Sequence, residues 1–198
     1  PETSCSTVFD LEMIKILEET GYKSATLAVT NNGKLVVARG YGWQDAKKSK
    51  PINPFTRMKI ASIEKAFIKV AIKKLMADER IQPSTLVFEF LNIKPLNGQF
   101  ADRRVYQITV QNLIDHKLGW DANHDGLSSK NERNVKMLFQ TEEPTFDQLN
   151  SFMASQLLQH DPGSKSQYSN YGHTLLTRVV AKASQKPYLD YVKQICEE

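Results

Sequence analysis

Ser62 and Lys65 lie three residues apart at the start of a segment with helical apolar spacing. Three residues make almost one helical turn, so we expect the hydroxyl and the amine to lie on the same face. A lysine kept partly neutral can take the proton of a serine, and a serine at a helix start offers its unpaired N–H to a developing oxyanion. The pair therefore suits acyl transfer, although an N-cap serine followed by a solvated lysine would show the same spacing.

Tyr168 and Asn170 form a Y-x-N sequence in a polar stretch that precedes another helical segment. A phenol can relay a proton between a serine, a lysine and a leaving group. An Asn amide can orient a substrate carbonyl or the lysine. The alternative is a surface turn that leads into an N-capped helix.

A third polar constellation lies between residues 121 and 132, where the sequence fits D-x-[DN]-x-[DN]-G-x5-E at every position. Calcium prefers six to eight hard oxygen ligands, and this spacing can wind alternate side chains around one ion, with Gly126 permitting the sharp turn. Because no second loop of this kind occurs, we expect a structural calcium site rather than a sensor, with a polar loop as the alternative. The predicted ligands are Asp121, Asn123, Asp125, the Leu127 carbonyl, Ser129 and Glu132.

The elements that must position these residues fall into two parts. A helix is expected at 8–19, and two β-rich runs, 24–30 and 34–42, flank an Asn-Asn-Gly turn typical of a hairpin. From Ser62 onward the pattern is helical, with no convincing further hairpin; the expected helices are 62–80, 108–118, 131–139, 146–159, 171–184 and 187–196. We expect an N-terminal helix-and-hairpin part at 1–61 and a mostly helical part at 62–198.

Composition excludes some classes of partner. The chain has 198 residues, 40% of them hydrophobic, and a net charge of +4. No window approaches the ~18 continuous apolar residues of a membrane span. The basic residues form scattered clusters without interleaved aromatics, unlike a nucleic-acid surface. We expect neither a membrane nor a nucleic acid as partner.

The order of these pieces resembles the serine β-lactamase and penicillin-binding-protein superfamily, especially its class C-like esterase, D-aminopeptidase and carboxypeptidase branch. The likeness runs collinearly from about residue 10 to the end, through residues 36–81, 108–121 and 160–192. It implies an α+β fold, with an antiparallel sheet flanked by helices and a mostly helical subdomain. It also implies Ser62 as the acylated nucleophile, Lys65 as its general base, Tyr168 as proton relay and Asn170 as a group that orients the substrate or the lysine.

The chain departs from that family at its C-terminal side. The family's third motif, K-T-G or H-x-G on a strand, lies beyond Y-x-N, whereas 117–119 and 124–126 carry similar letters before it and are interpreted as coincidental. The resemblance implies a helix end, not a catalytic role, for His116. A sheet of two strands would leave apolar faces and edges exposed. We therefore expect a second polypeptide or a C-terminal segment to complete the fold, tied through Cys196.

The two cysteines, Cys5 and Cys196, allow several pairings: with each other, with another chain, or none in a reducing compartment. The chain starts at Pro1, as a processed product would, and together with a calcium loop this favours a secreted or extracytoplasmic location. The favoured function is a serine hydrolase acting on an ester, amide or β-lactam-like bond of a small molecule or peptide. The alternatives are an inactive binding or structural protein on the same scaffold, and a calcium-responsive module.

Overall fold

The computed structural model describes residues 4–197, with side chains from Val8 onward. It divides into two compact units, Pro1–Ile60 and Ala61–Glu198, and each is described by itself. The expected division was between residues 61 and 62. In both units the longer helices and strands among the described residues follow the apolar periodicity of the sequence.

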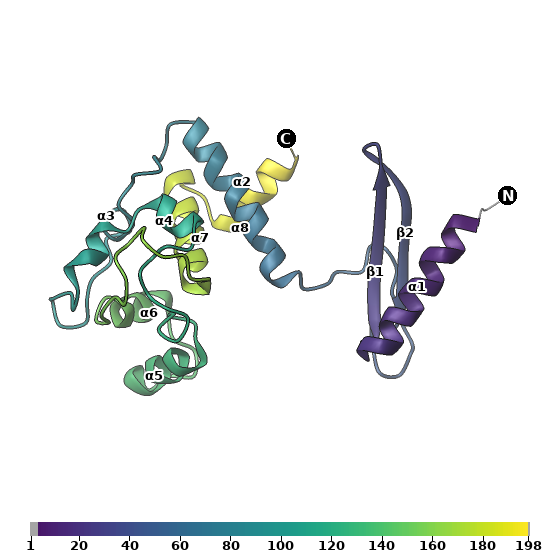
Figure 1. Cartoon of the computed structure of the whole chain (residues 1–198), viewed down its shortest axis with the longest axis horizontal. Coiled ribbons are helices and arrows are strands. Elements are labelled where there is room, and N and C mark those ends of the chain that lie inside the picture. Colours follow the sequence, from purple (N-terminus) through teal and green to yellow (C-terminus); the bar gives the residue numbers. More distant parts are fainter. Residues whose placement is uncertain (1–3, 198) are drawn as a thin grey trace. The chain divides into compact units, whose positions relative to one another are not determined.

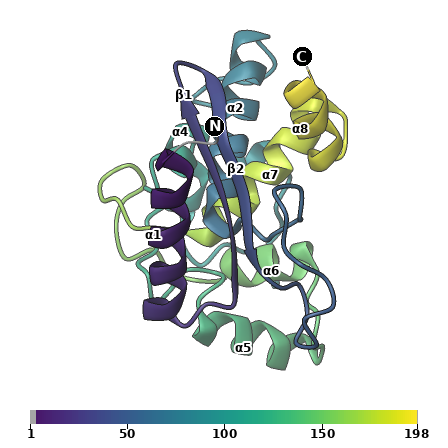
Figure 2. The same cartoon turned by 90° about the vertical axis from the view of Figure 1, so that its right-hand side faces the viewer.

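The first unit is a helix beside a hairpin. Helix α1 (Ser4–Thr20) precedes strands β1 (Ser24–Asn31) and β2 (Lys34–Gly42), which pair antiparallel. Asn32 and Gly33 take the positive φ angles, 49° and 72°, that a tight hairpin turn needs. Figures 1 and 2 show α1 running alongside the hairpin.

Little of the apolar surface of this unit is covered. Among the described side chains of residues 8–60, only Ile52 is buried, whereas Leu35 and Val36 on β2 are 62% and 55% exposed. The Tyr41 hydroxyl donates a hydrogen bond of 2.6 Å to Asp10, which ties β2 to α1. Hydrogen bonding and a single buried residue are a small basis for a sheet, because such an element normally draws its stability from a packed face.

The second unit is helical and holds the main core. A 3-10 turn at Ala61–Ile63 leads into α2 (Glu64–Ala77), which packs against α7 (Asn170–Ser184) and α8 (Tyr188–Glu197). The other elements are shorter: α3 (Val87–Phe90), the 3-10 turn η2 (Arg103–Gln107), α4 (Val110–Ile114), α5 (Ser129–Phe139) and α6 (Phe146–Met153).

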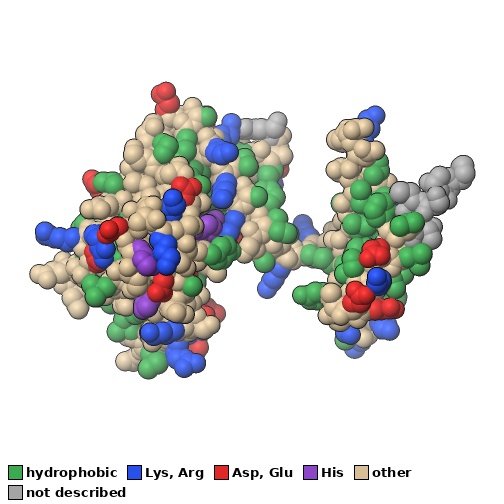
Figure 3. Space-filling model, in the orientation of Figure 1, with side chains coloured by type: hydrophobic (Ala, Val, Ile, Leu, Met, Phe, Trp, Pro, Cys, Tyr) green, Lys and Arg blue, Asp and Glu red, His purple; other side chains and the backbone are tan. Residues whose placement is uncertain are grey.

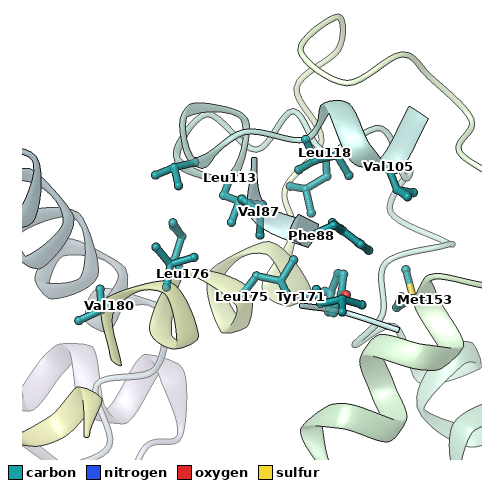
Figure 4. Packing of buried hydrophobic residues seen from close by; sticks show 14 of the residues in the cluster. Val87, Phe88, Val105, Leu113, Leu118, Met153, Tyr171, Leu175, Leu176 and Val180 are labelled. Atoms are coloured by element: carbon teal, nitrogen blue, oxygen red, sulfur yellow. The ribbon is translucent and has the colours of Figure 1, made fainter. Parts of the chain in front are cut away.

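The apolar stripe of α7 organises this core. Leu175, Leu176, Val179 and Val180 recur at helical spacing and are fully buried. At the start of the same helix, the Tyr171 ring is also fully buried. Figure 4 shows Tyr171, Leu175, Leu176 and Val180 among apolar side chains from α3, α4 and α6. The core thus fixes α7, and with it the Y-x-N stretch that precedes it.

Some expected elements are shorter than predicted. The helix expected at 108–118 is only α4, because Thr109 and Asn112 form a capping box at its start and His116 takes a left-handed φ of 56° just past its end. The helix expected at 146–159 ends at Met153. The short α3 and η2 were not predicted, because four or five residues are too few to show a period.

The fold class is confirmed: helices accompany a two-stranded antiparallel sheet, as in a partial α+β fold. No helix within residues 4–197 has the length and apolar character needed to cross a membrane. On the face of the second unit visible in Figure 3, Lys and Arg side chains are spread out, with Asp and Glu among them. That face carries no continuous basic stripe.

Candidate active site

Ser62 lies in the 3-10 turn immediately before α2, which begins at Glu64, two residues later than the helix start at Ser62 that the sequence indicated. The N-cap of α2 is Ile63, whose side chain makes no capping hydrogen bond. Ser62 therefore does not serve as the helix cap. Its hydroxyl is directed instead toward two other polar side chains.

Four side chains predicted to act together do lie together. The Ser62 Oγ is 2.7 Å from the Tyr168 hydroxyl. The Lys65 Nζ donates to the Ser62 Oγ at 3.3 Å and to the Asn170 Oδ1 at 3.0 Å. Lys65 also lies 5.0 Å from the centre of the Tyr168 ring. The S-x-x-K and Y-x-N sequences thus meet through hydrogen bonds, with the amine between the serine and the amide.

The amine changes the acidity of the phenol. Hydrogen bonding with Lys65, and then with Ser62, lowers the pKa of Tyr168 below that of an ordinary tyrosine. A positive neighbour favours the phenolate because it stabilises the charged form. Tyr168 is 53% exposed, so solvent screens part of this effect. The phenolate is the form that can accept the Ser62 proton, and a lowered pKa raises the fraction of Tyr168 in that form.

The imidazole of His116 packs against the ring of Tyr168. Its ring stacks on Tyr168 at a centroid distance of 4.9 Å and on His173 at 4.6 Å. Burial, followed by the charges of Lys69 and Lys65, lowers the pKa of His116. A neutral imidazole keeps a lone pair, and the His116 Nδ1 accepts the Ser169 N–H at 3.1 Å. The sequence placed His116 only at a helix end. No residue spacing could have predicted that its ring stacks on Tyr168 and His173.

A pocket of about 300 Å³ is lined by two of the four residues, Lys65 and Asn170. His173, Leu127 and other side chains of α2 and α7 complete the lining, namely Glu64, Ile68, Thr174 and Thr177. The His173 Nε2 is buried without a hydrogen-bond partner. The pocket therefore combines apolar walls with a few polar groups, a mixture typical of small-molecule sites.

The predicted calcium ligands are not turned toward one point. The Asp121 Oδ1 accepts from the His124 Nδ1 at 2.7 Å and from the N–H of Asn123 at 2.9 Å. The Asp125 carboxylate is buried and accepts hydrogen bonds from Ser169 and Tyr171, outside the loop, and from Leu127 within it. Hydrogen bonds within the protein thus engage both carboxylates.

The other residues of the loop at 121–132 are likewise not arranged around a cation. Glu132 lies in the first turn of α5, and its carboxylate pairs with Lys136 at 3.2 Å. Gly126 is not among the residues with positive φ. Its Cα faces the Tyr171 ring so closely that a Cβ would lie 2.9 Å from a ring carbon. Within residues 4–197, no group of three or more His, Cys, Asp or Glu side chains is placed to hold a metal. Calcium binding stays a prediction, and the described side chains do not fit it.

The tripeptides at 117–119 and 124–126 contribute no polar contact to the four residues. Leu118 is buried in the core, and the His124 Nδ1 is bonded to Asp121. Cys196 is exposed and free. The side chain of Cys5 lies outside the described residues. The predicted link through Cys196 is therefore still a prediction.

An exposed serine bonded to a lysine one turn away and to the tyrosine of Y-x-N is the arrangement that the resemblance to the β-lactamase and penicillin-binding-protein superfamily implied. The chain belongs to the Beta-lactamase family, whose model matches residues 10–195. Protein flp of Staphylococcus aureus (strain NCTC 8325 / PS 47) is 27% identical over 179 residues, which are 89% of this chain and 33% of flp.

Solved structures show the same fold. A Beta-Lactamase/D-Alanine Carboxypeptidase from Pseudomonas syringae is similar with a TM-score of 0.76 and 20% identity, over 97% of this chain and 48% of that one. The octameric penicillin-binding protein homologue from Pyrococcus abyssi has a TM-score of 0.70 and 22% identity, over 93% and 40%. The chain thus spans half or less of each of these proteins.

Proposed function

We propose that this chain supplies the nucleophile and its proton-transfer partners to a serine hydrolase that works through an acyl-enzyme. One observation carries the proposal. The Ser62 Oγ is within hydrogen-bond distance of both the Tyr168 hydroxyl, at 2.7 Å, and the Lys65 Nζ, at 3.3 Å. A serine becomes a useful nucleophile only when such a base can remove its proton.

The step follows from those contacts. The Ser62 Oγ attacks the carbonyl carbon of an ester, amide or β-lactam-like bond, and its proton passes to Tyr168 or Lys65. The bond from that carbon to the leaving oxygen or nitrogen breaks, and the leaving group takes the proton. Water then attacks the acyl-serine, releases the acid and restores the Ser62 hydroxyl. Asn170 holds Lys65 through its Oδ1, and its amide nitrogen is available to a substrate carbonyl.

A second polypeptide or C-terminal segment is proposed to complete the molecule. Two facts support this: the chain covers 33% of flp, and apolar side chains on β2 are exposed. The added part would cover the hairpin and supply the third motif and half of the oxyanion hole. Cys196, exposed near the end of α8, is the proposed point of a covalent link.

Substrate and setting are proposed at the level of class. A pocket of about 300 Å³ suits a small molecule or the end of a peptide. An extracytoplasmic location is proposed because a disulfide link through a cysteine persists in oxidising compartments. Neither a nucleic acid nor a membrane is a proposed partner.

Covalent labelling tests the proposal. The complete protein is incubated with a fluorophosphonate and, separately, with a fluorescent penicillin, and the modified peptide is located by mass spectrometry. Labelling of Ser62 is expected, with none in Ser62→Ala. Ser164→Ala removes an exposed serine outside the site and should label normally. A folded protein that takes up neither probe would favour the alternative, an inactive binding protein on this scaffold.

A further inference from the structure

Ser169 separates the two candidate catalytic residues Tyr168 and Asn170, and its hydroxyl is bonded twice. It donates to the Asp125 Oδ2 and accepts the Gly172 N–H at 2.8 Å. Ser169 is buried and is the N-cap of α7. A hydroxyl that both accepts and donates is fixed in its rotation as well as its position. The residue between the relay and the orienting amide is therefore held rigidly.

The backbone of Ser169 is fixed as well. Its N–H donates to the His116 Nδ1 at 3.1 Å, and its carbonyl lies 3.2 Å from the His173 Nδ1. Both imidazoles belong to the ring stack that reaches Tyr168. Hydrogen bonds to both its side chain and its backbone thus hold Ser169 in place. Asp125 is the only carboxylate among these partners.

That charged partner, Asp125, is itself immobilised. Its Oδ1 accepts the Leu127 N–H at 3.0 Å and the Tyr171 N–H at 3.4 Å. Its carbonyl accepts from the Asn131 Nδ2 at 3.1 Å. A buried carboxylate that faces the start of a 15-residue helix is stabilised by the unpaired N–H groups there, and its bond to the serine is charge-assisted.

We propose that Asp125 is a positioning residue for acyl transfer: through the Ser169 hydroxyl it sets where Tyr168 and Asn170 stand relative to Ser62 and Lys65. The inference rests on the proposed function. It assigns a role to the motif that the sequence indicated as a calcium loop. The acidic position most central to that motif binds the active-site stretch of this chain.

The test compares Asp125→Ala and Ser169→Ala in the complete protein, with Asp102→Ala as a matched control. Asp102 is also a largely buried carboxylate that caps a turn, but its bonds run to Arg104 and Leu158. The rate constant for Ser62 labelling is measured where circular dichroism shows each variant folded. A fall of about 10²-fold is expected for Asp125→Ala and Ser169→Ala, because small misplacements of catalytic groups cost that much. The control should stay within about twofold, since its loss is one of stability alone.

The pH dependence separates positioning from stability. If Tyr168 moves away from Lys65, its pKa rises, so the rising limb of the labelling rate, which follows the fraction of phenolate, moves to higher pH in the two variants and not in the control. If Asp125→Ala does not fold, Ser169→Ala alone tests the positioning role, because the Ser169→Ala variant keeps the other hydrogen bonds of Asp125. Folded variants whose labelling rate and its pH dependence equal those of the parent would overturn the inference and leave the proposed function standing.

If the parent is not labelled at all, the proposed function fails, and positioning is then read directly. The tyrosine ring carbons are labelled with ¹³C, and Tyr168 is titrated by NMR in the parent and in Ser169→Ala. A higher Tyr168 pKa in the variant supports positioning by Asp125 through Ser169. An unchanged pKa contradicts it.

Discussion

The Tyr168 hydroxyl lies 2.7 Å from the Ser62 Oγ, across 106 residues of sequence. The two residues come from opposite ends of the helical unit, and the packing of α2 against α7 brings them together. Neither short motif contains this contact. The stacked ring of His116 holds the phenol at that distance.

Removal of the phenol oxygen alone is expected to slow acylation. Tyr168→Phe keeps the ring on His116 but takes away the proton acceptor, so the Ser62 labelling rate should fall by about 10²- to 10⁴-fold. The thermal midpoint should change little, because the hydroxyl is exposed with the rest of the residue. Tyr106→Phe, at another exposed tyrosine, is the control. Equal rates in parent and Tyr168→Phe would remove Tyr168 from the proton path.

Lys65→Met should both slow the reaction and change its pH dependence. The amine is the first cause of the lowered pKa of Tyr168, so its loss returns the phenol toward its ordinary pKa. The rising limb of the labelling rate, which follows the fraction of phenolate, should therefore shift to higher pH. Lys73→Met removes an exposed lysine of the same helix and should shift nothing. A limb that stays in place would mean that Lys65 does not act on the phenol.

Buried His173 and partly buried His116 predict acid sensitivity. Burial lowers the pKa of His173 to about 4, and burial also lowers that of His116. The unfolded chain binds these protons at higher pH than the folded one does. Stability is therefore complete above about pH 6.5 and is lost as the pH falls toward 4, at up to ~1.4 kcal/mol per unit of pKa difference.

Urea denaturation at pH 7, 6 and 5 measures that loss. His173→Gln should flatten the dependence on pH, whereas His160→Gln, outside the ring stack, should keep the parent slope. A parent protein equally stable at pH 7 and pH 5 would show that folding does not lower the pKa of these two rings.

Calcium addition tests the loop at 121–132. Because Asp121 and Asp125 take partners within the protein, we expect calcium and a chelator to give the same thermal midpoint. A bound ion would raise the midpoint by mass action. If calcium raises it and Glu132→Gln abolishes the rise, the calcium prediction holds and the loop rearranges on binding.

The sequence predicted the elements whose periodicity is long. The hairpin at 24–42 and the helices that became α2 and α7 all follow from apolar spacing and the Asn-Gly turn. The resemblance then placed Ser62, Lys65, Tyr168 and Asn170 in one site, where the structure brings them together. Their catalytic roles stay predictions until labelling is measured.

The sequence could not predict which partners the side chains of the loop at 121–132 would take. A pattern of oxygens from Asp121 to Glu132 specifies which side chains could face inward, but the buried carboxylate of Asp125 is bonded to Ser169, 44 residues away. The local spacing of residues gives no sign of a hydrogen-bond partner so distant in the sequence. The His116 stack escaped for the same reason, since it depends on a left-handed residue just beyond α4.

The contact between Ser62 and Tyr168 also bears on how the protein matures. Contacts between residues so far apart in sequence form late, because a long loop must close first. Until the chain has been synthesised past Asn170 and α7 has docked, Ser62 has neither relay nor oriented base. A nascent or misassembled chain therefore carries an ordinary serine, and reactivity arrives only with the finished fold.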